Sequence, residues 1–182
     1  MTDLDLSGLF EAHRDGLAGA VRGVLGGRAD VAEVLQDAFL NAWKAVQNGK
    51  RPEDPVAWMF VLTLNRARDH RRQFARRPTA RALDETTAVQ IPTTQPEPTR
   101  QAEGHEALDA ARVAIRGLAA TEQEVFLLRV SGELSFPAIA EALSIPVGTA
   151  KSRMRSALER LRHKLASHAP GGPSLELEGG TR

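Results

Sequence analysis

The stretch 121–165 constrains the fold more than any other part of the sequence, because it combines helix-start, helix-stop and turn signals at short spacing. Thr121, followed three residues later by Glu124, predicts a capping box in which each side chain satisfies an unpaired backbone donor at a helix start. Gly132 is expected to supply the left-handed residue that ends this helix. A first short helix is therefore predicted between these signals.

A second and a third helix are predicted directly after it. Ser135 is expected to cap the second helix, with Pro137 in its first turn, where a missing N–H costs little. Leu143 closes that helix, residues 144–146 form a tight joint, and the last helix runs from about Val147 to Ala166. Two helices joined by a turn of three to four residues are the parts of a DNA-binding helix-turn-helix.

The last helix is expected to have an apolar face and a cationic face. Its apolar residues step by three or four and form one stripe, made of Val147, Ala150, Met154, Leu158, Leu161 and Leu165. Cationic residues lie off the stripe: Lys151, Arg153, Arg155, Arg160, Arg162 and Lys164. This pattern alone fits a helix on DNA phosphates and an ordinary solvated helix equally well. The preceding helix and turn favour DNA.

Charge is distributed in blocks, although the net charge is only +1. Residues 65–81 hold seven arginines and one aspartate, and residues 125–182 hold eight basic and five acidic side chains. Between them, residues 82–124 hold three basic and eight acidic side chains. Two basic blocks separated by an acidic one predict two contacts with a polyanion.

The N-terminal part is also predicted to be helical. A first helix is expected over residues 7–25, capped by Ser7 and stopped at Gly26-Gly27, although its glycines weaken it. Asp30 is expected to cap a second helix that ends near Asn48-Gly49. A third helix begins at Asp54-Pro55 and ends at Pro78. No segment alternates like a strand, so the chain is predicted to be all-α.

Composition divides the chain into two small helical domains joined by a flexible linker. Residues 1–77 form the first domain, and residues 78–104, which are rich in proline and threonine, have the composition of a linker. The second domain, which contains the helix-turn-helix, covers residues 105–168 and begins with a helix near His105. Residues 169–182 are rich in glycine and are expected to be disordered.

Catalysis, metal binding and membrane insertion have little support. The sequence has no cysteine, its five histidines are scattered, and neither a nucleophile motif nor a phosphate-binding glycine loop occurs. No cofactor is expected. No apolar run reaches the length of about 20 residues that a membrane span needs, and no secretory signal starts the chain. A soluble cytoplasmic protein is expected.

Two tryptophans and one phenylalanine lie where either core packing or DNA contact is possible. Trp43 lies on an apolar stripe and is expected in the core. Trp58 is favoured for the core as well, with base stacking as the alternative. Phe74 lies among arginines, so it fits either the core or the DNA surface.

With these residues considered together, the chain resembles an extracytoplasmic-function sigma factor, a compact member of the sigma-70 family of transcription initiation factors. Residues 9–15 and 30–43 are similar to the family's first helices. Residues 57–58 and 64–72 resemble its reader of the minus-ten promoter element, and residues 121–165 resemble its minus-35 reader.

The resemblance implies binding to core RNA polymerase and to promoter DNA, no catalytic site, and regulation by an anti-sigma factor. The residues expected at core polymerase are Glu33, Gln36, Asp37 and Asn41. Those expected near the minus-ten strand are Trp58, Asn65, Arg68, Asp69, Arg71, Arg72 and Arg76. Those expected at the minus-35 duplex are Thr149, Lys151, Ser152, Arg153 and Arg155.

The sequence also departs from the family pattern, most usefully at Ser156 and Leu158, where arginine is frequent. Because serine and leucine carry no positive charge, two possible phosphate contacts are absent from the minus-35 reader. Two alternatives to a sigma factor stay open on the sequence: a stand-alone helix-turn-helix regulator that binds duplex DNA, and a metal-dependent nuclease that uses Asp30, Glu33 and Asp37.

Overall fold

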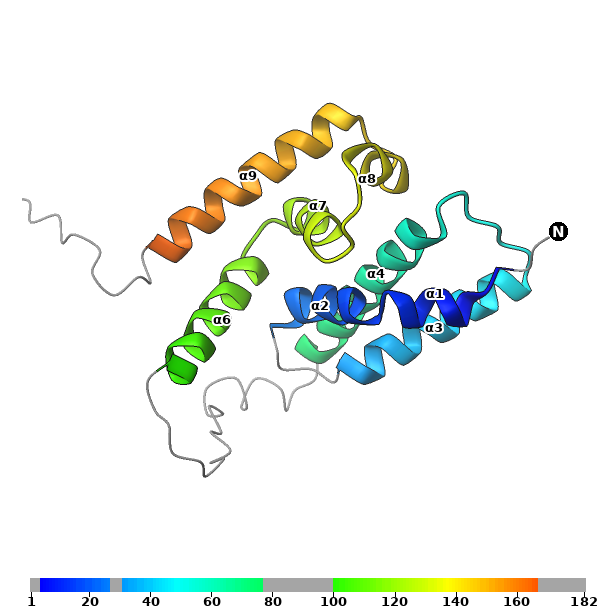
Figure 1. Ribbon diagram of the computed structural model, residues 1–182, viewed down its shortest axis with the longest axis horizontal. Coiled ribbons are helices and arrows are strands. Elements are labelled where there is room, and N and C mark those ends of the chain that lie inside the picture. The colour runs from blue at the N-terminus through cyan, green and yellow to red at the C-terminus, as the bar shows by residue number, and fades with distance from the viewer. Residues whose placement is uncertain (1–3, 27–30, 77–99, 167–182) are drawn as a thin grey trace, which may run out of the picture.

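The computed structural model describes residues 4–26, 31–76 and 100–166, with side chains from residue 107 onward in the last range (Figure 1). Every regular element in these ranges is an α-helix, which confirms the all-α prediction. The expected linker up to residue 99, the expected tail, Gly27, Asp30 and Pro78 lie outside the described residues.

Four helices form the N-terminal domain: α1 (Leu6–Ala12), α2 (Arg14–Leu25), α3 (Val31–Gln47) and α4 (Pro55–Ala75). The prediction of one helix capped by Ser7 was wrong. Asp5 caps α1 by accepting a hydrogen bond from the Gly8 N–H at 2.9 Å, and the backbone breaks at His13 between α1 and α2. Because His13 alone departs from helical geometry, the apolar spacing continues across the break and conceals it.

Two predicted ends in this domain are confirmed. Gly26 ends α2 in the left-handed conformation, with φ of 72°. Asp54 caps α4, since its carboxylate accepts a hydrogen bond from the Ala57 N–H at 2.9 Å and Pro55 occupies the first turn. The side chains of Phe60, Leu64 and other α4 residues then pack with α2 and α3 in one buried core.

The C-terminal domain consists of α6 (Arg100–Arg116), α7 (Ala120–Val130), α8 (Phe136–Ala142) and α9 (Val147–Ala166). The first of these helices begins earlier than the expected start near His105. The bounds of α9 and the Ser135 cap on α8 match the predictions, and the Ser135 Oγ accepts from the Ala138 N–H at 3.2 Å. Ser144 takes a left-handed φ of 52° in the tight joint between α8 and α9.

The predicted capping box at Thr121 was wrong. Ala119 precedes the first turn of α7, and the Glu122 carboxylate accepts from the Ala119 N–H at 3.3 Å. Gly132 is not left-handed either; Glu133 takes the positive φ of 54°. A Cβ on Gly132 would lie 2.8 Å from the Leu128 carbonyl oxygen and 3.3 Å from the Phe60 ring, so the glycine is needed for close approach.

The two domains are packed together rather than separate. In Figure 1, α6, α7 and α8 lie along the side of the N-terminal domain that α2 and α4 form. Leu127, Leu128 and Ile139 belong to the same buried cluster as Phe60 and Leu64, so one apolar core continues across both domains.

Candidate nucleic-acid interface

The open face of α4 carries five of the predicted minus-ten residues. Their spacing of seven, four, three and four residues places them on one side of the helix; they are Trp58, Asn65, Asp69, Arg72 and Arg76. Asn65, Arg72 and Arg76 are exposed, and Asp69 forms an ion pair with Arg72. This face offers one amide and two guanidinium groups to solvent.

The other two predicted residues on α4, Arg68 and Arg71, face the protein. The Arg68 Nη1 lies 2.7 Å from the Glu124 carboxylate of α7, and its Nη2 donates to the Ala120 carbonyl at 3.2 Å. Arg71 donates to the Val24 carbonyl at 3.3 Å. Burial lowers the pKa of Arg71, and the positive charges of Arg68, Arg116 and Arg72 lower it further.

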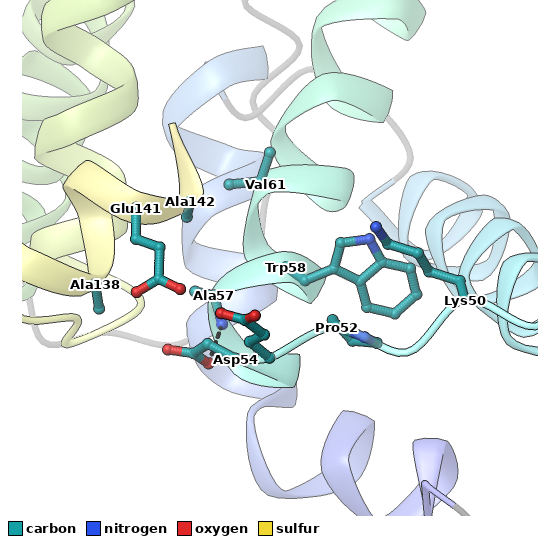
Figure 2. A pocket seen from close by; sticks show the side chains of 10 residues that line it. Lys50, Pro52, Asp54, Ala57, Trp58, Val61, Ala138, Glu141 and Ala142 are labelled. Atoms are coloured by element: carbon teal, nitrogen blue, oxygen red, sulfur yellow. Dashed lines mark hydrogen bonds between the residues drawn. The ribbon is translucent and has the colours of Figure 1, made fainter. Parts of the chain in front are cut away.

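Trp58 is half-buried at the start of α4, where it lines a hollow of about 250 Å³ between the two domains. Figure 2 shows its indole beside Lys50 and Pro52, with Glu141 of α8 on the other side of the hollow. The indole is therefore neither fully buried in the core nor fully exposed to solvent. Trp58 lies about 10 Å along α4 from Asn65, at 1.5 Å per residue.

The residues expected at core polymerase lie along α3. Gln36 and Asn41 are exposed, while Asp37 accepts a hydrogen bond from the Arg66 Nε at 3.0 Å. Glu33 lies 3.9 Å from the His70 Nε2. Two of the four residues thus face basic side chains of α4, and two face solvent.

The prediction that Trp43 lies in the core was wrong. Trp43 is 46% exposed and Leu40 is 44% exposed, and both continue the face of α3 that begins at Gln36. The Trp43 ring contacts only the outer edge of the core, with its centroid 6.3 Å from that of Phe39. Apolar periodicity could not separate a core stripe from an exposed apolar contact surface, because both repeat at the same spacing. Phe74, left open by the sequence, is 48% exposed.

The predicted apolar stripe of α9 is only partly buried, because Val147, Leu158 and Leu165 are 37–39% exposed. Ala150 is buried in the large core cluster, whereas Ala157 and Leu161 are buried in a smaller cluster with Ala114 of α6 and Leu118. Lys151, Ser152 and Arg155 are exposed on the first half of α9, and Arg153 is half-buried beside them. The Ser152 Oγ donates to the Thr149 carbonyl at 3.0 Å. The first three turns of α9 therefore present polar and cationic groups to solvent.

Two cations in the second half of α9 contact other parts of the protein, while Arg162 is exposed. Arg160 lies 3.2 Å from the Glu122 carboxylate, and the Lys164 ammonium donates to the Gly117 carbonyl at 2.9 Å. These two residues join α9 to the segment around α7. The cationic pattern of the sequence did not indicate these two contacts within the protein.

Comparison with known protein families accounts for both faces. The model of sigma-70 region 2 matches residues 9–77, and the model of sigma-70 region 4 matches residues 108–161. The first match contains α4, and the second contains α9 as far as residue 161. The chain belongs to the sigma-70 family. Its resemblance to extracytoplasmic-function sigma factors is thereby confirmed.

Two similar proteins are themselves named as sigma factors. The chain is 26% identical over 136 residues to the RNA polymerase sigma factor HrpL of Pseudomonas syringae pv. syringae, which covers 75% of this chain and 73% of the relative. It is also 26% identical over 146 residues to the ECF RNA polymerase sigma-E factor of Escherichia coli strain K12, at 75% and 74% coverage. This sigma factor directs transcription initiation.

Solved structures of sigma factors share the fold. CnrH, solved in complex with the cytosolic domain of CnrY, superposes with a TM-score of 0.63 at 24% identity and covers 90% of this chain and 89% of its own. The sigma factor RpoE, solved with the anti-sigma factor NepR from Bartonella quintana, gives 0.62 at 20% identity, with 88% and 96% covered.

Within the sigma factor, the departures found in the sequence fall at the edge of the α9 face. Ser156 is half-buried and Leu158 is 37% exposed. Because both side chains are uncharged, neither adds a cation to the exposed turns of α9. Among the described helices, none is both long and apolar enough to cross a membrane.

Proposed function

We propose that this sigma factor binds core RNA polymerase and reads a promoter with two faces, α4 at the minus-ten strand and the first half of α9 at the minus-35 duplex. One observation carries the proposal: two helices from different domains each expose a polar, cationic face while burying the opposite one. The division into an N-terminal and a C-terminal domain belongs to the same proposal, with the C-terminal domain beginning at or before Arg100, where α6 begins.

On α4, Asn65 and Trp58 have the chemistry that an opened strand requires. The Asn65 amide can hydrogen-bond the edge of an unstacked base, and an indole can stack on its face. Arg72 and Arg76, exposed on the same side, neutralise the neighbouring phosphates. Asp69 pairs with Arg72 and orients its guanidinium.

On α9, Thr149, Lys151, Ser152, Arg153 and Arg155 form the proposed minus-35 surface. Arginine in the major groove donates two hydrogen bonds to guanine, whereas Lys and Ser reach phosphate oxygens as well as bases. The half-buried position of Arg153 restricts its side chain and favours it as the base reader, while exposed Lys151 and Arg155 suit phosphates.

We infer that the face of α3 docks core polymerase through Glu33, Gln36, Asp37 and Asn41, with Leu40 and Trp43 at its centre. Exposed aromatic and aliphatic groups surrounded by polar ones are typical of protein interfaces, and tryptophan is enriched among residues that dominate binding energy. An ion-paired Asp37 is held in a fixed position for this contact by Arg66.

Further partners and limits follow from the relatives. The complexes of CnrH with CnrY and of RpoE with NepR support an anti-sigma factor for this chain too. We infer that it acts in the cytoplasm, where the polymerase is, and that it has no catalytic site of its own. Glu33 and Asp37, the residues of the nuclease alternative, each lie beside a basic side chain of α4, which does not suit a shared metal ion.

Transcription with purified components tests the function. The sigma factor and core polymerase together are expected to give transcripts from specific members of a promoter library, and each alone gives none. Transcripts that appear without the sigma factor or without core polymerase would contradict the proposal. A promoter library that gives no transcript when both are present would contradict it too. Specific duplex binding by the sigma factor alone, without an effect on transcription, would support the stand-alone regulator instead.

A further inference from the structure

The hollow of about 250 Å³ between the start of α4 and the helix α8 has mainly apolar walls. Small side chains form much of its lining, among them Val61 of α4 and Ala138 and Ala142 of α8. The Trp58 indole adds an aromatic surface to the same lining (Figure 2). Apolar and aromatic walls with a few polar groups are the usual form of a site for a small molecule.

The polar groups of this hollow are mostly carboxylates. Glu53 and Asp54 line it from the segment that leads into α4, and Glu141 lines it from α8. The Asp54 carboxylate accepts the hydrogen bond from the Ala57 N–H that caps α4. Within the described part of the chain, neither Glu53 nor Glu141 forms an ion pair. Two uncompensated carboxylates from different domains therefore line one cavity.

One cation also lines the hollow but does not neutralise it. Lys50 is exposed and lies beside the Trp58 indole (Figure 2). In the ranges that the structure describes, its ammonium group pairs with neither Glu53 nor Glu141. The lining thus carries three carboxylates against one ammonium group, and its net charge is negative.

Promoter binding does not account for this negative charge, because carboxylates repel DNA phosphates. An organic cation suits the lining better, since an indole face attracts an ammonium group and a carboxylate forms charge-assisted hydrogen bonds with it. A metal ion suits it less well. Among the described residues, no group of three or more histidine or acidic side chains could hold one.

We propose that the hollow between α4 and α8 binds a small aliphatic amine with at least two positive charges, a diamine or a polyamine. Its ammonium groups pair with Glu53 and Glu141, and its methylene chain lies against the Trp58 indole and the apolar walls. The site itself does not depend on the proposed function. One consequence does rest on it: if the indole also stacks on a promoter base, the amine and the minus-ten strand compete for Trp58.

Amine titrations of the free protein test the site without DNA or polymerase. Trp43→Phe leaves Trp58 as the only tryptophan, so its fluorescence reports the hollow. We expect a saturable change with putrescine, and weaker binding of butylamine by about two- to fivefold, because one exposed ion pair is lost. Uncharged butanediol should give no change. Equal binding of putrescine and butylamine, or no saturable change with putrescine or spermidine, would overturn the proposal.

Charge variants in the Trp43→Phe protein are expected to shift the putrescine affinity in opposite directions. Glu141→Gln removes an anionic partner and should weaken binding by about two- to fivefold, whereas Lys50→Gln removes a competing cation and should strengthen it by a similar factor. Glu133→Gln, at an exposed residue outside the lining, is the matched control and should change nothing. One affinity shared by all these proteins would rule out the hollow as the site.

Binding of a single-stranded minus-ten oligonucleotide tests the competition. Putrescine also binds the oligonucleotide itself, so the comparison is between two proteins at the same amine concentration. Putrescine should weaken oligonucleotide binding more in the Trp43→Phe protein than in its Glu141→Gln variant. Equal weakening, together with amine binding that depends on Glu141, would refute base stacking by Trp58 and leave the amine site. Loss of the amine titration with intact oligonucleotide binding would refute the site and leave the proposed function.

Discussion

Individual cations in this protein differ in role because of what lies next to them. Arg66 and Arg160 face the carboxylates of Asp37 and Glu122, whereas Lys151 and Arg155 face solvent. All four residues are cationic and all four lie on helices. The partner, which comes from another part of the chain, decides whether an arginine holds the fold or is available to a phosphate.

Arg153→Ala is expected to weaken binding to a minus-35 duplex by about 1–3 kcal/mol and to relax the preference at one base pair, because a bidentate base contact is lost. Competition binding against duplexes with single base changes measures both effects. Arg160→Ala, on the same helix but paired with Glu122, should leave DNA affinity unchanged. Equal losses in the two variants would remove Arg153 from the base contacts.

Leu158→Arg is expected to strengthen binding of this surface to duplex DNA. The position is 37% exposed, so a longer cationic side chain can reach solvent and a phosphate. One added phosphate contact should make the slope of log K against log salt steeper by about 0.9. Titrations at several salt concentrations measure that slope, and an unchanged slope would place residue 158 away from the DNA.

At the scale of the elements, α3 combines an inner face that builds the core with an outer face that has no partner in the described chain. Leu40 and Trp43 are too exposed to contribute much to stability, yet both are large and apolar. An exposed apolar face lowers the solubility of a protein. A protein partner that covers the face removes this effect.

Trp43→Ala is expected to weaken binding to core polymerase by about 2 kcal/mol or more, roughly 30-fold, while the helical content stays that of the wild type. Binding of labelled sigma factor to core polymerase measures the affinity. Leu165→Ala removes a side chain of similar exposure, 38%, from the far end of α9 and serves as the control. A variant at position 43 with wild-type affinity would separate this face from polymerase docking.

The sequence predicted those elements whose signals are local. The Asp54 cap, the Ser135 cap and the bounds of α9 depend on residues within a few positions of one another, and all three were right. The break at His13 was missed because the apolar spacing continues across it, and the cap of α7 at Ala119 was missed because Thr121 has a more typical capping side chain. Local chemistry does not show which of two adjacent caps the packing selects.

The helix that carries the predicted minus-ten residues was predictable from the sequence, but the contacts of those residues were not. Six of the seven lie within α4 and Arg76 follows its last residue, but Arg68 and Arg71 face the protein because Glu124 and Val24 meet them there. The glycines of α2 could be read only as a weakness of that helix, because their packing partner lies about a hundred residues further along the chain.

At the scale of the whole molecule, the described parts of the two domains share one buried core. Their buried side chains form a continuous cluster, and Gln123 hydrogen-bonds both sides. A single cooperative unfolding transition follows from such a shared core. Both tryptophans, Trp43 and Trp58, lie in the N-terminal domain, so fluorescence reports that domain while far-UV circular dichroism reports the helices of both.

Gly23→Leu is therefore expected to split the unfolding transition. The new side chain would collide with Leu127 and force α7 away, whereas within α2 leucine is a better helix former than glycine by up to about 1 kcal/mol. In urea, the fluorescence and dichroism curves should coincide for the wild type and separate for the variant, with helix loss beginning before the tryptophan signal changes. Gly148→Leu, at a glycine with nothing within 4 Å, should leave the two curves coincident. Coincident curves for Gly23→Leu would mean that the domains unfold together without the α2–α7 contact, and the coupling would then lie in the α4 contacts with α7 and α8.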